Sequence, residues 1–451
     1  MTLTQLRQTM SDLKISQEAK LDTYNCFLNE YKSDENKQNK TVLVQTDSRK
    51  IFLVDGISSV IETLERLPFS RVMWCSLVFY PIDWREDKLF ECLSARLLNN
   101  PNNEVLLLAL QTWVEECGPE FTSKSLDLFK ELLSSIESRI DEKTKVVFSK
   151  VKETITTTKS NETEPTFQMI FNPAKLTING RSVTLPQWAR TTVFSANILN
   201  KDFLDIASQL MICEHTFLSK LQPKDFYLYT FPTSREESNI KVYLKWSALV
   251  SNWVAFALIN QQNEMIREIA FKNFLQLALK CLEIRNFNSF NSVVTGLLHF
   301  ANSIMVTSIS QRTPDEVKLL DQLVILQAKV LHSDYSLLFD KPSIPCIKYF
   351  LGQINKIYSE VDEIDDTTGS IPSEEELSKM FDASKAFLIG DIIYSIRNVT
   401  GHLEIKPNEQ MKEFFLSTLR TMKLANDELL ELAKASEKRD KEKQVGKVNP
   451  I

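Results

Sequence analysis

The chain has 451 residues, of which 43% are hydrophobic and 25% charged, and its formal net charge is −6. This length predicts two or three domains with buried cores. With only 9 glycines, the composition favours a mainly α fold over a doubly wound α/β enzyme. The negative charge, without any long basic stretch, argues against nucleic acid and favours a protein partner.

The first part of the chain combines a small β element with amphipathic helices. Residues 1–50 form a polar segment. From its end onward, "TVLVQTDSRKIFLV" (41–54) has two short runs of alternating side-chain character on either side of a turn-forming Thr-Asp-Ser. This alternation predicts a β-hairpin. From 51 to 142, stretches such as "NEVLLLALQTWVEECGPEF" show helical periodicity and predict a first helical domain.

A polar region separates this domain from a larger one. Residues 143–195 read as a linker by composition, with a second β-hairpin near 175–185, where Asn179-Gly180 supplies the positive φ of a tight turn. Residues 196–436 are almost wholly helical in pattern, and the charged tail 437–451 is expected to fray. The predicted fold is therefore mainly α, with two helical domains and two small hairpins.

The sequence offers little for cofactor, metal or membrane chemistry. The seven cysteines include no Cys-x-x-Cys pair, which is typical of reduced core thiols in a cytosolic protein. The four histidines lie at no metal-ligand spacing, and there is no Gly-rich phosphate loop or nucleophile elbow. The apolar stretch Trp246–Ile259 contains polar residues and is too short to cross a bilayer. We therefore expect a buried helix there, no transmembrane segment, no cofactor and no metal.

One polar interruption stands out within the larger helical region. The segment "CLEIRNFNSFNSVVTGLLHF" (281–300) places Asn286, Phe287, Asn288 and Ser289 between two apolar helical runs. Asn286 and Asn288 could end the first helix through a left-handed residue, and Asn288 or Ser289 could cap the next. Taken alone, the segment predicts a corner between two helices of a bundle.

An ordered series of motifs resembles the Ras-type guanine nucleotide exchange factor family. The series comprises "FLDIASQL" with Glu214, "FLSKLQPKDF", "SNWV" followed by Arg267, "NFNSFNSVVTGL", "IPCIKYFLGQINKIY" and "ASKAFLIGDIIYSIRNV". Upstream, "DGISSVIETL", "WCSLVFYPIDWREDKLFECLSAR" and "LLLALQTWVEECGPEF" resemble the N-terminal Ras exchanger motif of that family. Each motif is weak alone, but the ordered series is fairly specific.

The resemblance implies a mechanism without covalent chemistry. In the family, the first helix of a helical hairpin pries switch I of a small GTPase away, an apolar residue blocks the magnesium site, and an acidic residue engages the phosphate-loop region. Here the hairpin would span about 348–385, with its first helix over Lys348–Val361. The wedge position falls on Tyr358 and the acidic position on Asp362.

The same resemblance assigns further residues. Ile354, Ile357 and Val361 would form the packing face of the first hairpin helix, and Ile354 and Asn355 join Tyr358 and Asp362 as predicted catalytic residues. The predicted GTPase-binding residues are Asn286, Phe287 and Asn288, which would hold the surface for switch II, Tyr349 and Phe350 at the hairpin base, and Lys356 and Ser359 facing the GTPase. The implied partner is a Ras-subfamily GTPase of the Ras, Rap or Ral type.

Each of these residues also has a purely structural interpretation. Tyr358 suits a half-buried helix position, Asp362 a solvated acidic loop, and Phe287 the core. Trp253 is expected to be structural in any case. Arg267 fits a surface ion pair as well as it fits a site residue.

Two alternatives from other classes stay open at the level of the whole protein. The family's basic triplet after its last catalytic "f-K" is replaced by Ala386, Phe387 and Leu388, so a non-catalytic adaptor that keeps the exchanger fold is the main rival. An α-solenoid ranks low because no repeat of 30–50 residues is visible. A cytoplasmic location is expected, including a host cytosol if the source is an intracellular bacterium that secretes the protein as an effector.

Overall fold

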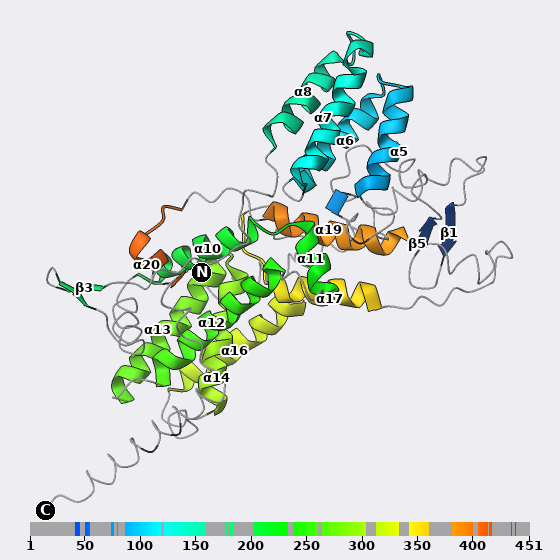
Figure 1. The fold of residues 1–451 in the computed structure, drawn as a ribbon. Helices are drawn as coiled ribbons and strands as arrows, with labels where there is room; N and C mark the ends of the chain where they lie inside the picture. The colour runs from blue at the N-terminus through cyan, green and yellow to red at the C-terminus, as the bar shows by residue number, and fades with distance from the viewer. Residues whose placement is uncertain are drawn as a thin grey trace, which may run out of the picture.

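The protein is described from a computed structural model (Figure 1). The structure describes residues 41–45, 50–54, 74–75, 79, 86–118, 121–158, 176–178, 181–183, 202–232, 238–259, 264–303, 313–332, 342–359, 381–399, 405–413 and 415–416, with Lys434 and Lys438. Helices dominate these residues and the strands are short, which confirms the predicted mainly α fold class.

A first group of helices lies together on one side of the molecule (Figure 1). It consists of α5 (Glu86–Asn99), α6 (Glu104–Cys117), α7 (Ser123–Ile136) and α8 (Lys145–Thr157). Aromatic rings fill its core, where Trp113 stacks on Trp74 at 5.4 Å between ring centroids and meets Phe129 edge-on at 5.3 Å. Both arrangements are favourable for aromatic pairs.

Helix α8 occupies residues that composition alone placed in a linker. Phe148, Val151 and Ile155 fall on one face of α8 and are buried, and the helix packs against α6 and α7. The apolar residues at this spacing form a helical stripe that the many Lys and Thr residues around them conceal. The first helical group therefore extends past the boundary expected at residue 142.

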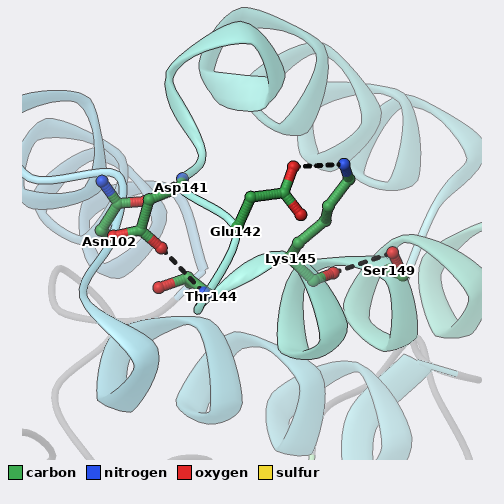
Figure 2. Close-up of polar contacts among 6 residues, drawn as sticks. All are labelled: Asn102, Asp141, Glu142, Thr144, Lys145 and Ser149. Carbon is green, nitrogen blue, oxygen red and sulfur yellow. Dashed lines mark hydrogen bonds and ion pairs between the residues drawn. The ribbon is translucent and has the colours of Figure 1, made fainter.

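A polar turn between α7 and α8 closes one end of this group, after a single turn of 3-10 helix at Glu137–Arg139 (Figure 2). The Asp141 carboxylate accepts a hydrogen bond from the backbone N–H of Thr144 at 2.8 Å, and that bond lowers the pKa of Asp141. The backbone N–H of Asp141 donates to the side chain of Asn102, between α5 and α6, at 2.9 Å. Lys145 and Glu142 form an exposed ion pair of 2.8 Å, which adds little stability.

A larger helical body follows. Its helices are α10 (Phe203–Leu218), α11 (Pro223–Thr230), α12 (Asn239–Ile259), α13 (Glu264–Glu283), α14 (Phe287–Ser303) and α16 (Pro314–His332). Helix α12 lies at the centre, where Trp253 is fully buried against Phe274 and Phe415. This confirms that Trp253 is a core residue.

Helices α12 and α14 approach each other closely at Gly296. A Cβ atom at this position would lie 2.5 Å from the backbone oxygen of Ser251 and 2.6 Å from Cβ of Val254. The glycine of "VVTGLL" is therefore required by the helix contact, because any side chain would push the two helices apart.

Two further helices form a layer against this body. Helix α17 (Ile347–Ser359) and helix α19 (Ala383–Val399) pack against each other. In Figure 1 the end of α17 and the start of α19 lie on the same side, and the short helix α11 stands beside both. Helix α19 also lies between the larger body and the first helical group. The sequence predicted α17 over Lys348–Val361, close to its observed bounds.

The short strands match the two predicted hairpins and add one element. Strand β1 (Thr41–Gln45) pairs antiparallel with β2 (Lys50–Val54), and β3 (Leu176–Ile178) pairs with β4 (Arg181–Val183) around Asn179-Gly180. The unexpected element is β5 (Phe381–Asp382), which pairs with β2 directly before α19. The first hairpin is thus joined by backbone hydrogen bonds to the segment that opens α19.

Helix α12 is long and apolar enough to cross a membrane by length and composition alone. However, 67% of its most apolar window is buried inside the protein. The core helix of a soluble protein passes the same test, so this helix is weak evidence for a membrane span.

The contact at Gly296 gives a direct test of the packing between α12 and α14. Gly296→Ala should lower the free energy of unfolding by about 1–3 kcal/mol, because the added methyl group overlaps the backbone of α12. Gly352→Ala is the matched control, since a Cβ at the exposed Gly352 meets nothing within 4 Å. That change should raise the stability by up to about 1 kcal/mol. Urea unfolding followed by tryptophan fluorescence measures both, and equal effects would contradict the close approach.

Candidate functional site

The site is built on the corner between α13 and α14. Helix α13 ends in a Schellman motif. The backbone N–H of Asn286 donates to the carbonyl of Cys281 at 2.8 Å, and the backbone N–H of Arg285 donates to the carbonyl of Leu282 at 3.1 Å. Arg285 adopts the left-handed conformation with φ 65°. The prediction that Asn286 or Asn288 would be the left-handed residue is therefore wrong.

Asn286 instead caps α14 and pairs with a distant segment. Its Oδ1 accepts a hydrogen bond from the backbone N–H of Ser289 at 3.0 Å, so Asn286 is the cap, and not Asn288 or Ser289 as predicted. Its two neighbours bond to Ile344: the N–H of Phe287 donates to the Ile344 carbonyl at 2.9 Å, and the N–H of Ile344 donates to the Arg285 carbonyl at 3.0 Å. This bridge holds Asn286 extended, as a capping residue must be.

The bridge explains why a polar corner interrupts the apolar helices. Ile344 lies three residues before α17, so the corner fixes the chain at the point where α17 begins. Ile344, Cys346 and Ile347 are fully buried there. The base of α17 is thus held by backbone hydrogen bonds as well as by apolar packing.

A buried carboxylate supports the corner from α10. Glu214 has no exposed surface, and its Oε1 accepts hydrogen bonds from Asn288 Nδ2 at 2.8 Å and from Trp246 Nε1 at 3.4 Å. Asn288 also donates to Ser247 Oγ on α12 at 2.9 Å. One asparagine and one glutamate therefore connect α10, α12 and α14.

Burial makes the Glu214 carboxyl hard to ionise. Loss of water raises its pKa to about 7 from an ordinary 4.5, although the hydrogen bond from Asn288 acts in the opposite direction. The cysteine thiols around it are buried too, and the pKa values of Cys213, Cys281 and Cys346 are raised chiefly by that burial. Among the described cysteines none forms a disulfide.

The predicted switch II residues lie inside the protein. Asn286 is 0% exposed, Phe287 6% and Asn288 1%. The Asn286 side chain caps α14 and the Asn288 side chain binds Glu214 and Ser247, so both hold the corner rather than facing solvent. A role in GTPase binding stays a prediction for these three residues, and it would act through the position of the corner.

Helix α17 has one packed and one open face. Ile347, Phe350, Leu351 and Ile354 are buried. Lys356 and Ser359 are exposed on the opposite side. Asn355 and Tyr358 are exposed as well, but Tyr358 lies in line with Ile347, Leu351 and Ile354, one turn beyond the last buried residue. Ile354 and Ile357 therefore lie on the packing side, as predicted, whereas Val361 and Asp362 lie outside the described residues.

The two aromatic residues predicted at the base of α17 contact each other. The rings of Tyr349 and Phe350 meet edge-on at 5.2 Å between centroids, and Phe350 is buried while Tyr349 is half-buried. At the other end of α17, Tyr358 is 48% exposed and its ring meets that of Phe231 edge-on at 4.8 Å.

A buried ion pair joins α19 to the first helical group. Arg397 Nη1 donates to Glu116 Oε2 of α6 at 2.6 Å and lies 3.8 Å from the Sγ of Cys75. The two paired side chains are only 21% and 9% exposed. Removing one member of such a pair leaves the other charge poorly solvated, so the contact strongly favours one placement of α19.

Some residues of this site escaped sequence reasoning. Glu214 was included in a motif, but no role was assigned to it. A lone acidic residue in the apolar run "IASQLMICEHTFL" does indicate a buried polar contact. Phe231, Glu116 and Arg397 gave no signal, because their partners are far away in the chain. Arg267, for which a surface ion pair was one interpretation, is 3% exposed.

Comparisons with known proteins agree with this geometry. Residues 205–380 match the RasGEF domain family. The chain is similar to the Ras guanine nucleotide exchange factor efc25 of Schizosaccharomyces pombe, with 22% identity over 51% of this chain and 23% of that protein. It is also similar to Rap guanine nucleotide exchange factor 5 of Homo sapiens, with 24% identity over 49% of this chain and 38% of that protein. RAS guanyl-releasing protein 4 of Bos taurus is 29% identical over 29% of this chain and 20% of its own length.

The comparisons support a Ras-type guanine nucleotide exchange factor at the level of the family. The chain spans less than two fifths of the length of each of these three relatives. The matched residues run from α10 to the segment before β5, so they include the corner and α17. They do not include the first helical group.

Glu214 predicts a specific dependence of stability on pH. Because its pKa is higher in the folded protein than in the unfolded chain, the unfolded state loses this proton first, and stability falls as pH rises from about 4.5 to about 7. That difference corresponds to a loss of about 3 kcal/mol. Glu214→Gln removes the titrating group and should abolish this part of the loss.

The measurement is urea unfolding of wild type and Glu214→Gln at several pH values between 5 and 8. The stability of the variant relative to wild type should increase as pH rises to about 7 and then level off. Parallel stability curves would contradict the assignment of a raised pKa to Glu214.

The ion pair on α19 gives a second test. Glu116→Ala should lower the free energy of unfolding by about 3 kcal/mol, because it leaves the Arg397 guanidinium unpaired in a mostly buried place. The control is Glu137→Ala, which removes an ion pair of 2.7 Å between side chains that are 46% and 51% exposed. Its effect should stay below about 1 kcal/mol. Similar losses in the two variants would argue against a structural role for the buried pair.

Proposed function

We propose that this protein is a guanine nucleotide exchange factor that binds a Ras-subfamily GTPase of the Ras, Rap or Ral type and promotes GDP release for GTP loading. Helices α17 and α19 would act as a helical hairpin, inserted near switch I and the magnesium site. The first helical group would serve as the N-terminal Ras exchanger motif. A cytoplasmic location belongs to the same proposal.

The observation that carries this proposal is that α17 has a fixed base and an exposed last turn. Its base is fixed by the bridge between Asn286 and Ile344, and its apolar face is buried up to Ile354. Beyond that point the last turn of the helix exposes Asn355, Lys356, Tyr358 and Ser359 to solvent. A helix that opens a partner needs a rigid attachment and an uncovered outer surface, and α17 combines both over 13 residues, or about 20 Å.

The proposed action is differential binding. A protein that binds loaded and empty GTPase equally well shifts no equilibrium, so the exchanger must favour the empty state. Tyr358 would block the magnesium site, and Asp362 would engage the phosphate-loop region. Both contacts are available only when nucleotide and metal have left.

The attachment of α19 also supports the proposal. Its buried face contains Ala386, Ile389, Ile393 and Ile396, and its last turn carries the ion pair between Arg397 and Glu116. The pair of helices is therefore braced from the first helical group as well as from the larger body. Bracing of this kind limits the loss of conformational entropy on binding.

The test is the release of a fluorescent guanine nucleotide from purified Ras-, Rap-, Ral-, Rab- and Rho-type GTPases. Wild type should accelerate release from a Ras-subfamily member. Tyr358→Ala should reduce this acceleration by about tenfold or more, which corresponds to about 1.4 kcal/mol of transition-state stabilisation. The double variant Tyr358→Ala with Asp362→Ala should abolish it.

Ile269→Ala is the matched control, because Ile269 is a hydrophobic residue with similar exposure, 52% against 48% for Tyr358, on the outer side of α13. With this variant, the GTPase should release its nucleotide at the rate measured with wild type. If the folded wild-type protein accelerates release from no GTPase of the panel, the non-catalytic adaptor becomes the better description.

A further inference from the structure

The side chain of Tyr358 has a neighbour that no family motif assigns. Phe231 follows directly after the last residue of α11, and its ring meets the Tyr358 ring edge-on, with centroids 4.8 Å apart and an interplanar angle of 71°. Edge-to-face pairs of this geometry are favourable beyond the area that they bury. The residue at the tip of α17 therefore has a lateral contact with a separate helix.

Phe231 is itself held in place. Its backbone N–H donates to the carbonyl of Tyr227 at 2.7 Å, and the two rings lie 5.0 Å apart. Tyr227 in turn meets Phe79 edge-on at 5.9 Å. These contacts support the ring of Phe231 independently of Tyr358.

Helix α11 is anchored at its other end by a buried carboxylate. Asp225 accepts hydrogen bonds from the backbone N–H groups of Gln222 and Asn239, each at 2.9 Å, and from Asn239 Nδ2 at 3.3 Å. Ser238 Oγ donates to the backbone carbonyl of Asp225 at 2.7 Å. Because α11 has only 8 residues, fixing its first turn to the start of α12 also fixes the position of Phe231.

Within the part of the chain that the structure describes, Tyr358 has little other support. It lies in the last described turn of α17, where the neighbouring residues Lys356 and Ser359 are exposed and Ile357 is only half-buried. An exposed tyrosine on a helix end loses side-chain entropy when it must adopt one position for binding. A fixed ring beside it reduces that loss before the partner arrives.

We propose that Phe231 is a positioning residue for Tyr358, which holds the tyrosine ring and the last turn of α17 in the orientation used against the GTPase. This inference rests on the proposed exchange function. It also assigns a purpose to the "QPKDF" motif and the aromatic run after it: they build a short rigid helix that supports α17 from the side.

The first experiment measures hydrogen–deuterium exchange of the isolated protein, without any GTPase. Phe231→Ala should speed amide exchange in residues 355–359 by about threefold or more, while residues 347–351 at the buried base of α17 exchange as in wild type. Phe231→Tyr keeps the ring and should restore the wild-type pattern. Unchanged exchange in residues 355–359 of Phe231→Ala would overturn the proposal.

The second experiment is a double-mutant cycle on nucleotide release from the most responsive GTPase. Phe231→Ala should lower the maximal release rate about three- to tenfold, with little change in the GTPase concentration that gives half of that rate, and Phe231→Tyr should restore it. In the Tyr358→Ala background the same change should have no further effect. Equal losses in both backgrounds would show a general structural defect and overturn the positioning role. If wild type is inactive on every GTPase, the proposed function has failed, and the hydrogen-exchange result alone decides whether Phe231 holds Tyr358.

Discussion

The hydrogen bond between Asn288 and the buried carboxylate of Glu214 is the contact around which the larger helical body is arranged. It joins α10 to α14, and the second hydrogen bond of Asn288, to Ser247, adds α12. Just before it in the chain, the left-handed residue Arg285 turns the backbone, and Arg285 and Phe287 bond to Ile344 on either side of Asn286. The polar corner thus determines where α17 leaves the body. Apolar packing alone would tolerate small shifts of these helices, whereas buried hydrogen bonds tolerate few.

The surroundings of α17 and α19 follow from that starting point. Helix α11 stands beside both helices, β5 pairs with β2 just before α19, and Glu116 holds Arg397 near the end of α19 (Figure 1). These supports come from separate parts of the chain. Together they leave the outer side of α17 uncovered and its base immobile, which is the arrangement that a helix acting on another protein requires. The function proposed for this layer therefore depends on contacts far from the exposed residues themselves.

Several buried polar groups in this protein are better explained by the geometry that they fix than by a gain in stability. Glu214 is ionised with difficulty in its buried place, and burial also raises the pKa of Asp225 against the hydrogen bonds that it accepts. A hydrophobic replacement of a buried ionic group is often at least as stable, so such groups are weak evidence of stability. Here each one joins the end or the middle of one helix to another helix. Their common effect is to select one arrangement of the helices.

The amino-acid sequence by itself determined the helical fold class and both β-hairpins, because periodicity and turn chemistry are properties of neighbouring residues. The approximate bounds of α17 came from the resemblance of its motif to a known family. The family resemblance also placed Ile354 on the packed face of α17, where it is buried, and Lys356 and Ser359 on the face that is exposed. Only the tertiary structure decided that Asn286, Phe287 and Asn288 are buried and that Arg285 is the left-handed residue. Glu214 and Asn288 are 74 residues apart, and Glu116 and Arg397 are 281 apart. No local pattern encodes pairs at such separations, since each forms only after the helices that carry its members have packed.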